Sequence, residues 1–159
     1  MLHTVGILQM KISDNPEDVI ITHSLGSCIG FSLYDPEPRI GGLVHCMLPF
    51  SEIDPERARQ YPCMFVDTGI PLLIQEMLAM GAEKARLVAK AAGAASLLDG
   101  AKLFCIGERN LAALRSTLQK YGIRIAAEDV GGTMARTMSL HLDRGVTMIK
   151  TCLRHYALE

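Results

Sequence analysis

The sequence contains no tryptophan, and only four phenylalanines and four tyrosines occur among its 159 residues. It also lacks an excess of either charge, because 16 basic residues stand against 17 acidic ones and the net charge is −1. Proteins that bind nucleic acids concentrate basic side chains on one surface, and those that bind single strands add aromatic side chains for base stacking. The composition therefore argues against a nucleic-acid partner.

No long hydrophobic run is present either. The most apolar stretch, residues 70–80, is interrupted by Gln75 and Glu76 and is shorter than the roughly 20 residues that span a bilayer. The N-terminus has no basic segment followed by an apolar block, which is the pattern of a secretion signal. These absences predict a protein that is not embedded in a membrane and that works in the cytoplasm.

Cysteine pairs at metal-binding spacing are missing as well. The chain has five cysteines, an odd number, and no two of them form a C-x-x-C motif. A disulfide framework and a zinc site are therefore not expected, and the cysteines are predicted to be free thiols of an intracellular protein. These patterns predict no metal and no cofactor.

What is present indicates one folded domain over residues 1–159. Hydrophobic residues make up 49% of the chain and charged residues 21%, a balance that excludes general disorder and supports a single core at this length. Strand-like runs lie at 19–22, 29–34, 41–48, 85–92, 123–127, 134–142 and 146–153, the last two joined by a hairpin turn. Residues 50–65 show no clear period and contain Pro55 and Pro62, so they are interpreted as a long surface loop.

Two helices are predicted after this loop. Apolar residues at helical spacing mark them at 68–80 and at about 110–121. Asp67 is expected to cap the first helix, Pro71 to lie in its first turn, and Gly81 to follow its C-terminus. The predicted fold class is therefore α+β: a mostly antiparallel or mixed sheet with two main helices packed against it.

A cysteine directly after a glycine-containing turn is the first candidate for chemistry. In Gly26-Ser27-Cys28, small neighbours let a substrate carbonyl approach, and backbone N–H groups of the turn can point at a developing oxyanion. A nucleophilic thiol also needs a base. His45 lies 17 residues after Cys28, in the predicted strand at 41–48. Thr22, on the strand that enters the turn, is a candidate for orienting the imidazole.

A structural role for the same residues stays open at this stage. Cysteine is among the residues most often buried, so Cys28 can equally be a small core side chain. The other four cysteines lack a glycine turn and are interpreted as core or surface thiols: Cys46, Cys63, Cys105 and Cys152. Arg109 and Asn110 are interpreted as turn and cap residues rather than as ligands of a substrate.

Several segments, in order along the chain, resemble the CheD family, the chemoreceptor glutamine deamidases of bacterial and archaeal chemotaxis. They are Thr-His-Ser-Leu-Gly-Ser-Cys at 22–28, Val-His-Cys-Met-Leu-Pro at 44–49, Val-Asp-Thr at 66–68, Lys-Ala-Ala-Gly-Ala-Ala-Ser at 90–96, Ile-Gly-Glu-Arg-Asn at 106–110 and Ala-Glu-Asp-Val-Gly-Gly at 127–132. The resemblance covers nearly the whole chain. Its most specific parts are the glycine-turn cysteine and the His-x-Met-Leu-Pro segment at this separation.

The resemblance implies a function, a site and partners. It implies hydrolysis of glutamine side chains of methyl-accepting chemoreceptors to glutamate, in chemotaxis adaptation, with the family's cysteine, histidine and threonine at Cys28, His45 and Thr22. The backbone of Gly26 and Ser27 would stabilise the oxyanion. The resemblance also implies a layered α/β sandwich similar to toxin-type cysteine deamidases, and two partners: the chemoreceptor cytoplasmic domain and a CheC-type phosphatase of the chemotaxis regulator.

Two positions depart from the family's pattern, and two rival functions stay open. The chain has Gly93-Ala94-Ala95 where the family usually has Gly-Gly-Ala, and His23-Ser24 where it has a leucine-glycine pair. The first change bears on close packing of that turn, and the second on the approach to Cys28. The rivals are a docking module that binds and stimulates a CheC-type phosphatase while Cys28 is idle, and a related acyl transfer such as transglutamination.

Overall fold

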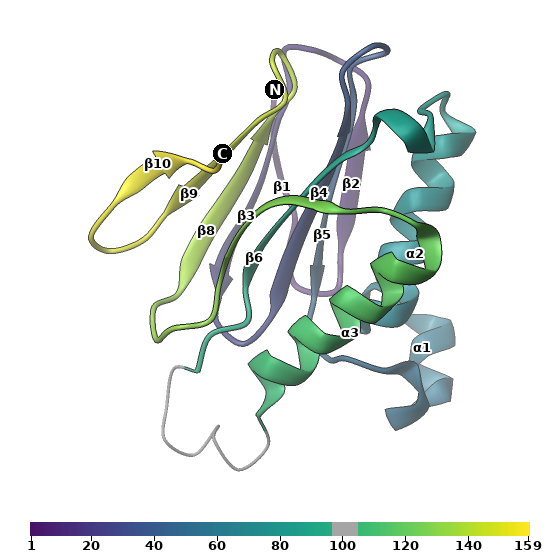
Figure 1. The fold of residues 1–159 in the computed structure, drawn as a ribbon, viewed down its shortest axis with the longest axis vertical. Helices are drawn as coiled ribbons and strands as arrows, with labels where there is room; N and C mark the ends of the chain where they lie inside the picture. Colours follow the sequence, from purple (N-terminus) through teal and green to yellow (C-terminus); the bar gives the residue numbers. More distant parts are fainter. Residues whose placement is uncertain (97–104) are drawn as a thin grey trace.

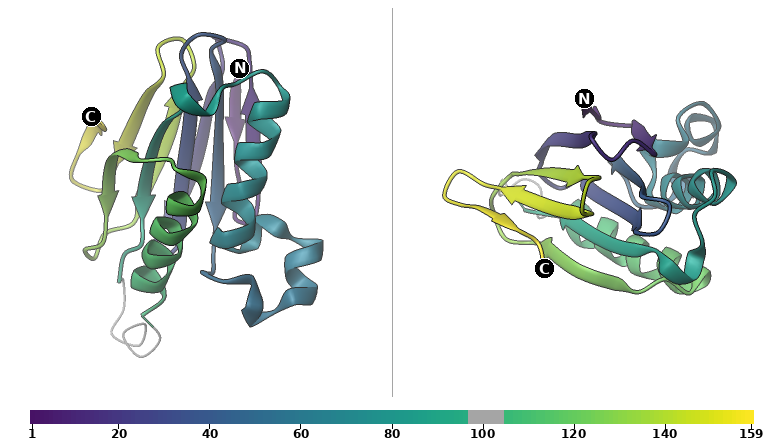
Figure 2. Two further views of the ribbon diagram at one scale, coloured as in Figure 1. Left: turned by 45° about the vertical axis from the view of Figure 1, so that its right-hand side comes forward. Right: turned by 90° about the horizontal axis from the view of Figure 1, so that it is seen from above.

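The structure, a computed structural model, describes residues 1–96 and 105–159. Its elements form three layers: an outer sheet, a central sheet, and helices against the far face of the central sheet (Figure 1). The view from above in Figure 2 shows the same stacking, with the helices outside the central sheet. The chain is α+β with mixed sheets, as predicted, and its strands divide between two sheets.

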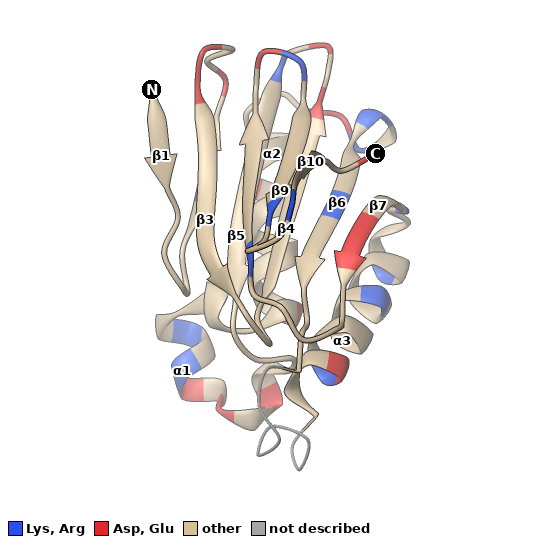
Figure 3. Ribbon diagram, turned by 90° about the vertical axis from the view of Figure 1, so that its left-hand side faces the viewer, with Lys and Arg blue, Asp and Glu red and all other residues tan. Residues whose placement is uncertain are grey.

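The outer sheet contains five strands in the order β1-β3-β8-β9-β10. They are β1 (Leu2–Thr4), β3 (Val19–Leu25), β8 (Arg136–His141), β9 (Val146–Lys150) and β10 (His155–Ala157). β1 and β3 are parallel, whereas the other pairs are antiparallel, including the predicted hairpin of β8 and β9. Figure 3 faces this sheet and shows little charge along β1 and β3, whereas charged residues lie in the end loops, on the helices and on β6 and β7.

The central sheet has the order β2-β5-β4-β6-β7 and is covered on both faces. Its strands are β2 (Met10–Ser13), β4 (Ile29–Asp35), β5 (Ile40–Cys46), β6 (Val88–Gly93) and β7 (Ile125–Val130). Every residue of β4 and β5 is buried, and successive side chains face opposite layers. Phe31 and Val44 enter the core beneath the helices, whereas Tyr34 and Leu43 enter the core between the sheets.

Two long helices pack on the central sheet. α2 (Val66–Ala79) and α3 (Ile106–Tyr121) contact each other there (Figure 1). Gly81 and Gly122 follow them with φ of +113° and +66°, the left-handed conformation in which glycine ends helices. α3 begins before the predicted start at 110. None of the described helices is long and apolar enough to cross a membrane.

The start of α2 corrects two predictions. Phe65 occupies the cap position, and Asp67 lies inside the first turn, where its carboxylate accepts hydrogen bonds from the Ser51 N–H (2.9 Å) and hydroxyl (3.1 Å). The first N–H groups of the helix, of Val66 and Asp67, donate instead to the backbone oxygens of Leu48 (2.8 Å) and Pro49 (3.3 Å). Because α2 begins two residues earlier than predicted, Pro71 lies in its second turn and not in its first, and its missing N–H removes one hydrogen bond of the helix.

The interpretation of residues 50–65 as a surface loop is wrong. They form three short helical segments: Ser51–Ile53, α1 (Pro55–Gln60) and Pro62–Met64. Ala58, Met64 and Phe65 make a small core of their own beneath them. Because each segment has only three to six residues, no helical period can show in the sequence. The same reason explains why β1, β2 and β10, of three or four residues each, were not predicted.

Candidate active site

The core between the two sheets contains a buried histidine bonded to a threonine. His45 on β5 lies two residues after Leu43 and therefore on the same face, toward the outer sheet, from which Thr22 on β3 reaches it. The Thr22 hydroxyl oxygen and His45 Nδ1 are 2.7 Å apart, and the two residues are 0% and 3% exposed. The structure therefore brings two of the three predicted residues into direct contact.

The Thr22 hydroxyl determines which imidazole nitrogen carries the proton. It also lies 2.7 Å from the backbone oxygen of Val5, which can only accept a hydrogen bond. The single hydroxyl proton is thus donated to Val5, and the hydroxyl oxygen accepts the N–H of His45 Nδ1. His45 Nε2 is then the unprotonated nitrogen, and it is buried with no hydrogen-bond partner among the described residues. The pair presents a neutral imidazole whose basic nitrogen is open.

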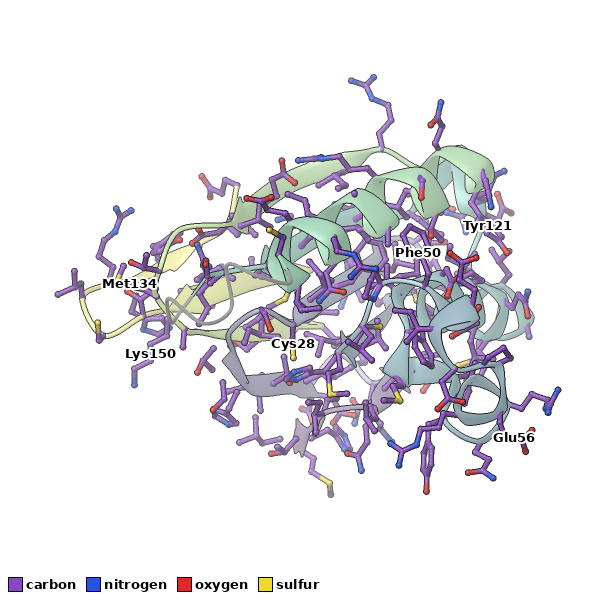
Figure 4. The ribbon with its side chains drawn as sticks, turned by 90° about the horizontal axis from the view of Figure 1, so that it is seen from below. Cys28, Phe50, Glu56, Tyr121, Met134 and Lys150 are labelled. Carbon is purple, nitrogen blue, oxygen red and sulfur yellow. The ribbon has the colours of Figure 1, made fainter. Side chains whose placement is uncertain are left out.

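Cys28 lies next to this histidine. Gly30 pairs directly with His45, so Cys28, two residues earlier, is a diagonal neighbour, and it belongs to the same core between the sheets. Cys28 is 9% exposed, and Figure 4 shows it near the middle of the lower end of the molecule. Its thiol is not hydrogen-bonded to His45 Nε2 in this structure. Cys28 is therefore beside the Thr22–His45 pair without being bonded to it.

Burial keeps both groups neutral at pH 7. It lowers the pKa of His45 from 6.5 to about 4, because the charged imidazolium would lose its hydration. It raises the pKa of the Cys28 thiol above its ordinary value, and the N–H of the same residue, which faces the sulfur, offsets only part of this effect. A thiolate is therefore absent at rest, and nucleophilic use of Cys28 requires proton transfer during the attack.

Three successive carbonyl groups hold the turn Gly26–Cys28. The first and last oxygens accept hydrogen bonds from the backbone N–H groups of Ala95 (2.9 Å) and Ala94 (2.8 Å). The middle oxygen, of Ser27, accepts one from the side-chain amide of Asn110, at 2.8 Å. Within residues 1–96 and 105–159, the N–H groups of the second and third residues of the turn have no partner in another residue. The turn is held by its oxygens, and these N–H groups stay available to a ligand.

Two glycines permit this close packing. Gly93 has φ +111°, and a Cβ atom there would lie 2.1 Å from the backbone oxygen of Cys28. In the first turn of α3, a Cβ atom at Gly107 would lie 2.6 Å from the backbone oxygen of Ala94. Only glycine fits at both positions, so α3 rests directly on the turn at 93–96, and that turn rests on the Cys28 turn.

The two departures from the family's pattern both fall in left-handed backbone. Ser24 has φ +60°, at the irregularity of β3 between Thr22 and Leu25, and Ala94 has φ +53°. A side chain in this conformation costs about 1 kcal/mol that glycine does not. The hydrogen bonds of the 93–96 turn to the Cys28 turn are nevertheless formed, so Ala94 strains this packing without opening it.

A cavity of about 150 Å³ lies against the Cys28 turn. Ser27, the residues 94–96, the start of α3, Gly131 and Gly132 line it. It is smaller than the roughly 300–1,000 Å³ of sites for drug-sized ligands, so it suits a single side chain. Across residues 1–96 and 105–159, no three histidine, cysteine, aspartate or glutamate side chains gather as metal ligands would.

The family model for CheD, described as CheD chemotactic sensory transduction, matches residues 47–151, more than half of the chain. This chain belongs to the CheD family. The matched span begins after Cys28 and His45, so it establishes membership through the helices, the 93–96 turn and the later strands.

Relatives of known name extend the CheD match to the first strands. The Solibacter usitatus protein named "Probable chemoreceptor glutamine deamidase CheD" is 50% identical over 141 residues, covering 89% of this chain and 83% of its own. CheD 2 of Anaeromyxobacter dehalogenans, with the same descriptive name, is 45% identical over 150 residues, 94% of each chain. CheD 1 of Syntrophus aciditrophicus is 40% identical over 147 residues, 92% of each. These alignments cover 89–94% of this chain, so they include the segment from Thr22 to His45, which the family model does not reach.

In this CheD chain the remaining cysteines have the predicted core or surface places. Cys46 and Cys63 are buried beneath the helices, whereas Cys105 and Cys152 are exposed. The interpretation of Asn110 as a cap residue is wrong, because it lies inside α3 and is fully buried. One signal was available: Asn110 lies three and four residues before Ala113 and Leu114, on the apolar face of the helix, where a polar side chain needs a partner.

Proposed function

We propose that this CheD-family chain is a chemoreceptor glutamine deamidase, a hydrolase that converts glutamine side chains of methyl-accepting chemoreceptors to glutamate. The names of its relatives support the activity, since three of them at 40–50% identity are named for it. We assign Cys28 as the nucleophile, His45 as the base, and Thr22 as the residue that orients His45.

The open nitrogen of His45 is the observation that supports this assignment most. Leaving a buried polar atom without a partner costs free energy, and a role as a base accounts for this cost at His45 Nε2. Thr22 occupies Nδ1 and leaves Nε2 as the basic atom, which is the state that a general base for the neighbouring Cys28 requires.

The first half of the proposed reaction releases ammonia. His45 Nε2 takes the Cys28 proton while the sulfur forms a bond to the side-chain carbonyl carbon of glutamine. The carbonyl electrons move to the oxygen, where backbone N–H groups of the Gly26–Cys28 turn stabilise the charge; one such donor is worth about 3 kcal/mol in comparable sites. The intermediate collapses as the C–N bond breaks, and the imidazolium gives its proton to the leaving nitrogen.

The second half regenerates the thiol. His45 Nε2 accepts a proton from water, and the resulting hydroxide adds to the thioester carbon. The C–S bond then breaks, the sulfur regains the proton from His45, and the glutamate side chain is released. Thr22 makes no covalent bond in either half; it keeps the proton on Nδ1 throughout the resting states.

The test compares two buried thiols. A chemoreceptor cytoplasmic fragment is incubated with the wild type, with Cys28→Ala and with Cys63→Ala, and peptide mass spectrometry records the glutamine-to-glutamate mass shift. We expect the shift with the wild type and with Cys63→Ala, and a rate lower by roughly 10⁴-fold with Cys28→Ala. Wild-type turnover by Cys28→Ala would refute the assigned nucleophile.

The rival acyl transfer and the docking module are tested in the same preparation. With a primary amine added, we expect glutamate and not an amine adduct, because water is the proposed acceptor. Absence of any mass shift with the wild type would favour the docking module.

The proposal also covers compartment and partner. The cytoplasmic domains of chemoreceptors are reached only from the cytoplasm, so this is where the chain would act. A CheC-type phosphatase is the protein partner that the family resemblance implies. Calorimetric titration of the chain with such a phosphatase tests the pairing, and the absence of heat at micromolar concentrations contradicts it.

A further inference from the structure

Asn110 connects the two segments on which the proposed chemistry depends. Its side-chain nitrogen donates to the backbone oxygen of Ser27, directly before Cys28, at 2.8 Å. The same nitrogen donates to the backbone oxygen of Met47, two residues after His45, at 3.0 Å. Asn110 is 0% exposed, so these two bonds are made out of contact with water.

The orientation of the Asn110 amide follows from its partners. Both partners are carbonyl oxygens, which only accept hydrogen bonds, so both protons of the amide nitrogen are committed. If the amide were flipped, its oxygen would face the backbone oxygens of Ser27 and Met47, and none of the three could donate a hydrogen bond. Its oxygen is instead left without a partner among the described residues, a cost that the fold accepts at this position.

The bond to Ser27 fixes a peptide plane. A trans peptide group is planar, with its C=O and N–H pointing in opposite directions. Holding the Ser27 oxygen on the side of α3 therefore turns the Cys28 N–H away from α3. That N–H faces the sulfur of its own residue and has no partner in any other described residue. It is thus aimed at the place where an oxyanion would form during attack by that sulfur.

We infer that Asn110 is a positioning residue that aims the Cys28 N–H at the oxyanion. Its anchor is rigid, because Gly107 brings the first turn of α3 into van der Waals contact with Ala94 and Ala95. The bond to Met47 adds a second point of attachment. This inference rests on the proposed function, since it assigns a donor to the oxyanion that Cys28 would generate.

The test substitutes Asn110→Asp, which keeps the shape and replaces the donor by a carboxylate oxygen facing two carbonyl oxygens. We expect kcat for the receptor fragment to fall roughly 10- to 100-fold while KM stays within about threefold, because an oxyanion exists only in the transition state. Alkylation of Cys28 by iodoacetamide forms no oxyanion, so its rate should change by less than about threefold.

Two further variants keep the test decisive. Leu118→Ala removes a buried side chain two turns further along α3 and reports the effect of loosening the helix alone; its kcat should stay within about threefold of the wild type. Asn110→Ser keeps a hydroxyl of shorter reach and is measured if the aspartate variant does not fold. We expect its kcat to lie between those of the wild type and Asn110→Asp.

The outcomes separate this inference from the proposed function. If Cys28→Ala turns over like the wild type, the assigned nucleophile is wrong, and the inference about Asn110 falls with it. If Cys28→Ala is inactive but Asn110→Asp retains wild-type kcat, only the role of Asn110 is wrong. If Asn110→Asp lowers kcat and the rate of Cys28 alkylation by the same factor, the inference is also wrong, because Asn110 would then act on the reactivity of the thiol and not on the oxyanion.

Discussion

The two ends of the central strands β4 and β5 each bury an ionisable side chain, and they treat it in opposite ways. At one end, Asp35 is fully buried and accepts four hydrogen bonds: two from Arg86 (2.8 and 2.9 Å), and one each from the N–H groups of Glu83 (2.8 Å) and Glu37 (3.1 Å). At the other end, His45 has one bonded nitrogen and one open nitrogen.

The charge states of the two groups differ accordingly. Burial alone would raise the pKa of Asp35, but the Arg86 guanidinium and the two N–H groups outweigh it, so the pKa is lowered and the carboxylate stays charged. Nothing offsets the burial of His45, whose pKa falls and which stays neutral. Asp35, whose carboxylate oxygens are all hydrogen-bonded, stabilises the fold. His45, with one nitrogen that makes no hydrogen bond, can accept a proton there.

Exchanging the two groups for amides gives the largest contrast. His45→Gln removes the proposed base, and we expect kcat to fall roughly 10⁴-fold with little loss of stability. Asp35→Asn removes the buried carboxylate from Arg86, which keeps its ion pairs with Glu37 and Glu83. Because the amide cannot accept all four hydrogen bonds of the carboxylate, we expect a loss of about 3 kcal/mol of unfolding free energy, with kcat unchanged at temperatures where the protein is folded. Urea unfolding and ammonia release measure both. Loss of activity in Asp35→Asn without loss of stability would break the comparison.

The pH dependence of stability separates the same two groups. Between pH 6.5 and about 4 the unfolded chain protonates His45 while the native state does not, so stability falls as the pH falls through this window, by about 3 kcal/mol in all. The lowered pKa of Asp35 acts only below about pH 4, where its unfolded carboxylate takes up a proton first. Urea titrations at several pH values give the unfolding free energy as a function of pH. Between pH 6.5 and 4, this free energy should change less with pH in His45→Gln than in the wild type. Equal slopes would contradict the buried neutral imidazole.

Removing the hydroxyl that orients His45 has a smaller effect. In Thr22→Val the shape is kept but Nδ1 loses its acceptor, so the proton can move to Nε2 and block the base. We expect kcat to fall about 10- to 100-fold, as for other groups that orient a catalytic or metal-binding histidine. The matched control is Thr147→Val, also buried between the sheets, with its hydroxyl 3.4 Å from that of Ser32. Similar kcat values for the two variants would show that Thr22 serves packing alone.

The smallest effect concerns the strain next to the Cys28 turn. Ala94→Gly relieves a left-handed alanine, and we expect the unfolding free energy to rise by less than about 1 kcal/mol, because the flexibility of glycine in the unfolded chain offsets part of the gain. Ala92→Gly, in the buried strand two residues earlier, should instead destabilise by about 1 kcal/mol or more. Thermal unfolding of both variants measures the difference, and a destabilised Ala94→Gly would show that Ala94 is not strained.

How far the sequence predicts this structure depends on the length of the local signal. The long helices have an apolar period that spans many residues, and the glycine turn before Cys28 and the hairpin of β8 and β9 have residue types that are specific to turns. These elements are found where the sequence predicts them, although α3 begins four residues earlier than expected. The segment from 50 to 65 and the three short edge strands have no such pattern, because three to six residues are too few to show a period. The cap prediction for Asp67 failed for another reason: Ser51, distant in sequence, supplies the bonds that its carboxylate accepts.

By itself, the sequence determined the family and the chemical types available: a thiol in a glycine turn, one histidine on a nearby strand, and a threonine before them. Only the tertiary structure decided their states, because those depend on atoms brought from distant parts of the chain. The backbone oxygen of Val5 accepts the Thr22 proton and so determines that Nδ1 of His45 is protonated. Burial between the two sheets keeps the Cys28 thiol and the His45 imidazole neutral. Asn110, more than 80 residues after Ser27, donates a hydrogen bond to the Ser27 oxygen and fixes the turn before Cys28. Hydrogen bonding and desolvation act through space, and no local pattern of residues encodes them.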